Sequence, residues 1–216
     1  GDAMRLARVS LFNYFAAAVL MPYRRFLAAC ESARYDVELL GHRFGTSYEQ
    51  TAHRMSTLQR ADARGVPFFF VRVDRAGNVS KRFSAGRFPF SKFGGTCPLW
   101  NIHAAFEAPD KVLTQVIRMP DGASYFSIAR TVTRTGGTFD QPAPKLAIGL
   151  GCEVSHAGSV VYADGLDLAK PRAFEPIGIS CRICPRPDCH QRSVPPIDRP
   201  LRIPADRNGP LPYEIT

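Results

Sequence analysis

Signatures of several enzyme classes are missing from this sequence. It contains no His-Glu-x-x-His zinc motif, no Gly-x-Ser-x-Gly nucleophile elbow, no Walker A loop and no Gly-x-Gly-x-x-Gly dinucleotide fingerprint. Its five histidines stand singly, which is typical of structural residues. The chain is therefore predicted not to be an enzyme of these classes.

Long hydrophobic runs are also missing. No apolar run approaches the roughly 20 residues that a membrane-spanning helix needs. The most apolar stretch, Phe12 to Met21, is about half that length and lacks a signal-peptide cleavage pattern. We interpret it as part of a buried helix and expect a cytoplasmic protein that does not contact membranes.

Positive charge is in excess and is scattered along the chain. The sequence has 28 Lys and Arg against 19 Asp and Glu, a formal net charge of +9. Such a surface attracts polyanions, either nucleic acid or a nucleotide-bearing ligand with several phosphates, such as coenzyme A. Because the basic residues do not run together, a disordered nucleic-acid-binding tail is not favoured.

The hydrophobic pattern predicts an α+β fold with helices first. Apolar residues recur at helical spacing in the first sixty residues, with Pro22, Gly45 and Ser47 at the expected ends of helices. The helices are predicted at 4–20, 23–34, 36–44 and from Ser47 to about Leu58. We expect this helical region to comprise residues 1–62.

After Gly65 the pattern changes to that of a mostly antiparallel sheet. Dense β-favouring runs are separated by turn signals rich in Gly, Pro, Asp and Asn. Strands are predicted at 66–73, 79–83, 112–119, 125–133 and 145–150, with a short helix at 99–107. From Pro171 onward Pro and Cys dominate and little regular structure is expected. This second domain is predicted to comprise residues 63–216.

Three closely spaced cysteines give the densest chemical signal. Cys181, Cys184 and Cys189 lie within nine residues, and Pro185 and Pro187 disfavour a helix between them. Thiolates at this spacing can turn inward onto one centre, and both tetrahedral Zn and a cubane [4Fe–4S] cluster want four protein ligands. Free structural thiols, or a redox disulfide between Cys181 and Cys184, are the alternative interpretation.

Three residues are candidates for the fourth ligand. Cys152 and Cys97 both follow glycines that permit close backbone approach, and His190 directly follows Cys189. We prefer Cys152, which ends a predicted strand, and place Cys30 in the core of a helix face. The predicted metal site is therefore Cys152, Cys181, Cys184 and Cys189, with either an iron–sulfur cluster or Zn.

Cations and aromatic residues alternate between Ser80 and Phe93. Cations can hold phosphates, and rings can stack on a purine or line a channel for an acyl chain. A solvated edge with ordinary core aromatics is an equal alternative. The predicted ligand-binding residues are Lys81, Arg82, Phe83, Arg87, Phe88, Lys92, Tyr125 and Arg130.

Two parts of the sequence resemble known families. Asn13 to Pro22 and Gly45 to Leu58 are similar to the second half of an ImmA/IrrE-type metallopeptidase domain. The sequence stretches at 65–69, 80–84, 93–100, 162–166 and 181–191 resemble the C-terminal region of short-chain fatty acyl transcriptional regulators.

The resemblance implies an acyl-CoA sensor, for propionyl-CoA in particular, with a [4Fe–4S] cluster. It also implies that DNA is bound only through an N-terminal helix-turn-helix domain that this chain lacks. Separately from the resemblance, we expect that the chain can form a homo-oligomer. Because the His-Glu-x-x-His half of the peptidase-like domain is absent, no peptidase activity is expected. The alternative function is a metal- or cluster-dependent enzyme with an open coordination position, or a chain that contacts DNA directly through its fourth helix.

Overall fold

The computed structural model describes residues 2–91, 95–133, 136, 138–204, 206 and 213–215. The first part is helical, as predicted. The helices are α1 (Asp2–Leu20), α2 (Tyr23–Ser32), α3 (Val37–Phe44) and α4 (Tyr48–Ser56). Two predicted helix ends are confirmed in detail: Gly45 closes α3 with φ of 62°, and Ser47 caps α4 in a reciprocal capping box with Gln50.

A mostly antiparallel sheet follows, which confirms the predicted α+β fold. Among the described residues its six strands have the order β4-β3-β7-β6-β5-β8, and only the β5–β8 pair is parallel. These strands are β3 (Phe69–Val73), β4 (Val79–Ser84), β5 (Leu113–Arg118), β6 (Ser124–Thr133), β7 (Lys145–Glu153) and β8 (Glu175–Pro176). Two small hairpins are β1 (Gln59–Arg60) with β2 (Ala63–Arg64), and β9 (Leu201–Arg202) with β10 (Glu214–Ile215).

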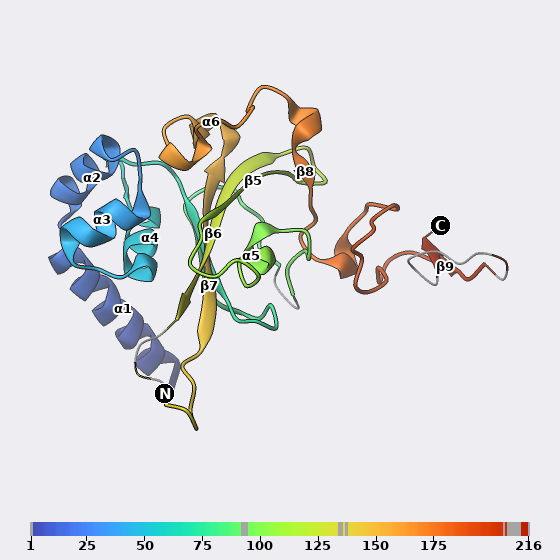
Figure 1. Ribbon diagram of the computed structural model, residues 1–216, viewed down its shortest axis with the longest axis horizontal. Coiled ribbons are helices and arrows are strands. Elements are labelled where there is room, and N and C mark those ends of the chain that lie inside the picture. Colours follow the sequence, from blue (N-terminus) through green and yellow to red (C-terminus); the bar gives the residue numbers. More distant parts are fainter. Residues whose placement is uncertain are drawn as a thin grey trace.

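Both faces of the sheet are covered, so the chain has two cores. One core joins α2–α4 to the face that carries Phe70, Phe126, Leu150 and Cys152. The other packs α5 (Asn101–Ala104) and the loop before it against the opposite face, which carries Phe69, Tyr125 and Ala147. Figure 1 shows the helical layer on one side of β6 and β7, and α5 and the C-terminal extension on the other.

Four short helical segments follow β7 in the described part of the chain. They are α6 (Val154–Ala157), directly after β7, and the 3-10 turns η1 (Val161–Ala163), η2 (Pro171–Ala173) and η3 (Cys181–Ile183). As expected, regular structure is sparse after Pro171.

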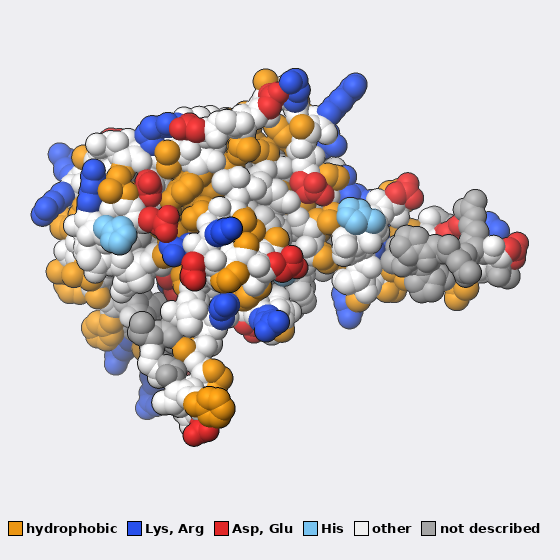
Figure 2. All heavy atoms as spheres, in the orientation of Figure 1, with side chains coloured by type: hydrophobic (Ala, Val, Ile, Leu, Met, Phe, Trp, Pro, Cys, Tyr) orange, Lys and Arg blue, Asp and Glu red, His pale blue; other side chains and the backbone are white. Residues whose placement is uncertain are grey.

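The prediction that the most apolar stretch is a buried helix was wrong. Helix α1 has no buried residue, and large apolar side chains are exposed along it, among them Leu6 at 70% and Phe12 at 71%. Figure 2 shows hydrophobic side chains at the surface over this helix. By length and composition α1 could cross a membrane, but a core helix of a soluble domain and a signal sequence have the same properties.

Two glycines of β7 make room for the second core. A Cβ on Gly151 would lie 2.3 Å from Cζ of Phe69 and 2.4 Å from the carbonyl oxygen of Phe126. A Cβ on Gly149 would lie 2.8 Å from both Ile102 and Val71. These glycines therefore serve the packing of Phe69 and Ile102, and not the approach of a metal.

Gly151→Ala is expected to destabilise the fold by about 3 kcal/mol, because neither the strand backbone nor the packed ring can withdraw. The matched control is Gly158→Ala, at a position with φ of −59° and open space around the new Cβ, and its effect should stay within about 0.5 kcal/mol. Urea unfolding of both variants tests this, and equal midpoints would contradict it.

Candidate functional site

Four cysteines line one small cavity beside the sheet. They are Cys181, Cys184 and Cys189 of the C-terminal extension, and Cys97 from the loop before α5. The cavity volume is about 10 Å³, room for about one water molecule. Two arginines, Arg186 and Arg192, also line it, and no carboxylate does among the described residues. The charged side chains that line the cavity are therefore positive in the described part of the chain.

The extension reaches the cavity because it is anchored to the edge of the sheet. Strand β8 pairs in parallel with β5, and the Ile177 N–H donates to the Arg118 carbonyl. The side chain of Arg186 returns to the same place, where its Nη2 donates to the Arg118 carbonyl at 3.0 Å. These bonds bring the cysteine loop to the face of the sheet where Cys97 lies.

The buried side chain of Arg192 shapes the loop itself. Its guanidinium donates to the Cys181 carbonyl at 2.9 Å, to the Cys184 carbonyl at 3.3 Å and to the Arg186 carbonyl. The Nε of the same side chain is buried and has no hydrogen-bond partner among the residues that the structure describes. A buried donor without a partner is costly, so this N–H fits a site that takes an acceptor such as a sulfide or thiolate.

Hydrogen-bond donors point at two of the sulfur atoms. Burial raises the pKa of the Cys97 thiol, whereas N–H groups of Gly178 and Leu99 lower it. Ser193 Oγ donates to Cys181 Sγ at 3.4 Å. Close approach is also built in at Gly178, where a Cβ would lie 2.8 Å from Cys184 Sγ. Hydrogen bonds to sulfur are typical surroundings of cysteine-bound centres.

Cys152, the preferred fourth cysteine, does not lie beside the other three. Cys152 is fully buried in the core on the opposite face of the sheet, where it pairs across the strands with Phe126. Burial raises the pKa of its thiol to about 12, as expected for an inert core residue. Cys30 lies in the same core, as predicted. Of the other two candidates, Cys97 lines the cavity, whereas His190 is exposed and does not.

The chemistry of this donor set fits a four-cysteine centre. All six cysteines are free, so the disulfide alternative is not formed. In the part of the chain that the structure describes, no three His, Cys, Asp or Glu side chains are already at the spacing needed to hold a metal ion. The four thiols therefore surround a common space without converging to ligand distance.

The predicted ligand-binding residues that the structure describes are divided between the two faces of the sheet. Phe88 and Tyr125 are buried in the second core, where Phe88 stacks on Phe69 with ring centroids 3.9 Å apart. Arg87 is exposed near Tyr125, and Arg82 donates to the Ser91 carbonyl.

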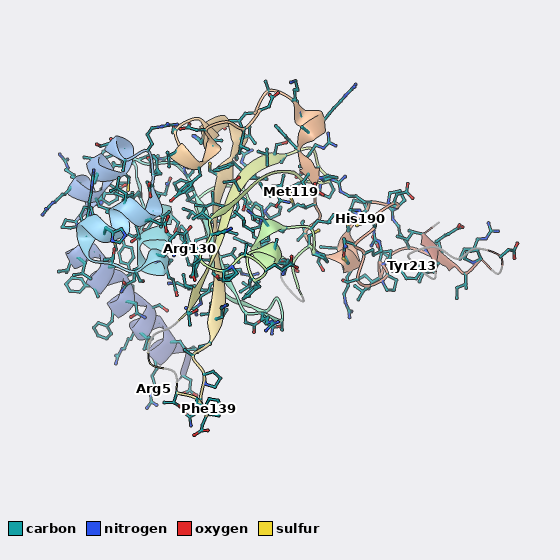
Figure 3. All side chains as sticks on the ribbon, in the orientation of Figure 1. Arg5, Met119, Arg130, Phe139, His190 and Tyr213 are labelled. Carbon is teal, nitrogen blue, oxygen red and sulfur yellow. The ribbon has the colours of Figure 1, made fainter. Side chains whose placement is uncertain are left out.

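The other predicted residues lie on the helical side of the sheet. Lys81 lies 5.5 Å from the centre of the Phe70 ring, and Phe83 pairs across the strands with the same Phe70. Arg130 bonds Glu38 of α3 at 2.7 Å and lies 5.1 Å from the centre of the Tyr48 ring. Figure 3 shows Arg130 between the helical layer and the sheet, far from the extension that carries His190. Lys92 lies outside the described residues.

Part of the predicted aromatic segment nevertheless adjoins the cysteine cavity. A second small cavity is lined by Phe88, Phe90 and Trp100 and shares Cys97 and Gly178 with the first. Sequence reasoning did not include Arg192 and Ser193, although their position three and four residues after Cys189 is a usable signal. It had noted the glycine-flanked loop of Cys97 but could not tell on which side of the sheet that loop lies.

Comparison with known families gives two adjacent matches. Residues 57–213 match the family described as short-chain fatty acyl coenzyme A regulator, C-terminal, and residues 7–56 match the IrrE N-terminal-like domain. The predicted domain boundary at residues 62 and 63 stays a prediction.

Curated relatives match almost the whole chain. It is 59% identical over 214 residues to the propionyl-CoA carboxylase regulator of Cereibacter sphaeroides, which covers 99% of this chain and 46% of that protein. It is 51% identical over 216 residues to the HTH-type transcriptional regulator RamB of Mycobacterium tuberculosis (99% of this chain, 46% of RamB). Identity to PrpR of the same species is 47% over 215 residues (100% of this chain, 44% of PrpR). The chain thus spans a little under half the length of these relatives.

A solved structure has the same fold. A Mycobacterium tuberculosis transcriptional regulator superposes with a TM-score of 0.94 at 47% identity, over 99% of this chain and 65% of that chain. All these relatives are named as regulators, in agreement with the prediction that the chain is not an enzyme. Since one family model matches well over half of its residues, the chain belongs to the short-chain fatty acyl coenzyme A regulator family, as its C-terminal region.

Proposed function

We propose that this chain is the ligand-sensing part of a cytoplasmic transcriptional regulator of short-chain fatty acid metabolism. It binds a short-chain acyl-CoA, and propionyl-CoA is the first candidate because one relative is named as a propionyl-CoA carboxylase regulator. DNA is bound by a region outside this chain, in keeping with the HTH-type names of two relatives.

The observation that carries the proposal is the gathering of Cys97 with the three cysteines of the extension around one cavity. We propose that these four thiolates hold a [4Fe–4S] cluster, with Zn as the alternative. A cluster supplies a centre that responds to oxidants and to iron supply. Four protein ligands leave no open position, so a catalytic metal is not favoured.

The proposed centre would link the extension to the loop before α5 and would also adjoin the aromatic cavity. Cys97 belongs to the loop that packs on the sheet, and the other three thiols belong to the extension, so a shared centre fastens one to the other. Arg186 and Arg192 offset the negative charge that four thiolates bring. Because Cys97 and Gly178 also line the neighbouring aromatic cavity, a change at the centre is passed to Phe88 and Trp100 by direct contact.

Anaerobically purified protein is expected to carry four irons per chain and a broad absorbance near about 400 nm. Cys97→Ala should remove most of this iron and absorbance, because one of the four ligands is lost. Cys152→Ala is the matched control, also a buried thiol, and should retain both. Iron analysis and an absorption spectrum of the two variants decide the point.

Two results would contradict that assignment. If Cys152→Ala lost its iron and Cys97→Ala retained it fully, the centre would have to be assigned to the other face of the sheet. A colourless protein with one Zn that depends on Cys97 would replace iron–sulfur with the alternative metal.

Propionyl-CoA is expected to stabilise the purified chain against heat. At a ligand concentration about 100 times the dissociation constant, the gain is about 2.7 kcal/mol. For a chain of this size that corresponds to a rise of roughly 5–10 °C in the unfolding temperature. Differential scanning calorimetry measures it, with sodium sulfate at equal ionic strength as the control. An unchanged unfolding temperature, together with no heat of binding, would refute acyl-CoA recognition by this chain.

A further inference from the structure

A broad cleft lies where the helical region meets the sheet domain, and it shares no lining residue with the cavity of Cys97, Cys181, Cys184 and Cys189. Its volume is about 650 Å³, within the range of sites for ligands of nucleotide size. Its walls come from the end of α2, from the β1–β2 hairpin with the segment after it, and from α6 and the turn that follows. Arg34 and Arg64 bring two exposed cations to it, and Glu31 is its only carboxylate among the described lining residues.

The backbone at one wall is strained. Arg34 and Tyr35 have φ of 47° and 60°, a left-handed conformation that two successive non-glycine residues rarely adopt. The Tyr35 N–H donates to the Cys30 carbonyl at 2.8 Å, and the Tyr35 hydroxyl accepts from the Val66 N–H at 3.1 Å. These bonds hold Tyr35 down in the core and leave Arg34 projecting at the rim of the cleft.

The Asp164 carboxylate binds the Arg34 guanidinium in the geometry that a phosphate group would use. Asp164 accepts from Nη1 and Nη2 of Arg34, both at 2.7 Å, in a two-pronged pair. The same geometry suits a phosphate group. Both side chains are well exposed, at 44% and 59%, and exposed pairs of this kind are weak. A ligand phosphate with more charge can therefore take the place of Asp164.

Displacing Asp164 would loosen a junction between the two parts of the chain. The Val161 N–H donates to the Arg34 carbonyl at 2.9 Å, and the Tyr162 hydroxyl accepts from the Val37 N–H at 3.0 Å. The segment around η1 is therefore fastened to the corner between α2 and α3, and the Arg34–Asp164 pair closes that corner on its exposed side.

We infer that this cleft takes the phosphates of a nucleotide-bearing anion through Arg34 and Arg64, in competition with Asp164. The inference rests on the proposed acyl-CoA ligand and deepens it. It assigns the phosphate subsite to residues outside the aromatic–cationic segment that the sequence pointed to. It also gives the ligand a direct route to the helical region.

The test is titration calorimetry of propionyl-CoA on the complete chain and four variants. Asp164→Asn removes the competitor and should tighten binding about 3- to 5-fold. Arg34→Gln and Arg64→Gln should each weaken it about tenfold or more. The control is Asp167→Asn, which changes the net charge by the same amount. The ion pair described for Asp167 is with Lys170, at 2.7 Å. This variant should bind propionyl-CoA as tightly as the unchanged chain does.

Propionyl-pantetheine, which lacks the phosphates, is the second probe and should be insensitive to all four substitutions. Thermal unfolding of each variant identifies any that fails to fold, and Arg64→Gln, which leaves the strained corner intact, keeps the test decisive. Equal affinity of the chain and its Arg34, Arg64 and Asp164 variants for propionyl-CoA would overturn the inference and leave the proposed function standing. Absence of binding to the unchanged chain would overturn both.

Discussion

The alternation of side chains across a sheet that is buried on both faces is the constraint on which this structure depends. Successive residues of β7 face different cores. The side chain of Cys152 therefore packs in the core shared with the helices, whereas Gly151 makes space for Phe69 on the other face. The same rule separates Tyr125 from Arg130 on β6. A shift by one position would exchange the two cores. The register of the central strands therefore decides which residues can meet at a site.

Most of the fold could be predicted because its signals are local. Ser47 and Gln50 form the capping box that their spacing suggests, Gly45 ends its helix, and the turn residues between strands lie where expected. The gathering of four cysteines could be predicted only in part, for the opposite reason. Cys181, Cys184 and Cys189 are neighbours in sequence, whereas the fourth cysteine is brought by tertiary structure. Glycines precede both Cys97 and Cys152, and this local feature does not show which face of the sheet each thiol joins.

The predicted ligand-binding segment is divided between the two faces of the sheet for the same physical reason. Composition brings cations and rings together along the chain, but an edge strand such as β4 sends Lys81 and Arg82 to opposite sides. The cleft at Arg34 and Arg64 gave no composition signal at all. Its cations are about thirty positions apart, and the strained backbone that presents Arg34 follows an ordinary helix end. Helix α1 shows a related limit, because its apolar character suggested burial that the described residues do not provide.

The role of Arg192 has a consequence for how the cysteine site assembles. A single guanidinium orders three carbonyl groups of the loop that carries the thiols, so the loop has a defined shape before anything binds between the sulfurs. Preorganisation of this kind lowers the entropy cost of capturing an ion or cluster. If the proposed cluster binds there, the same order would let it be lost and rebuilt without unfolding the extension. A metal site that is folded only by its metal does not have this property.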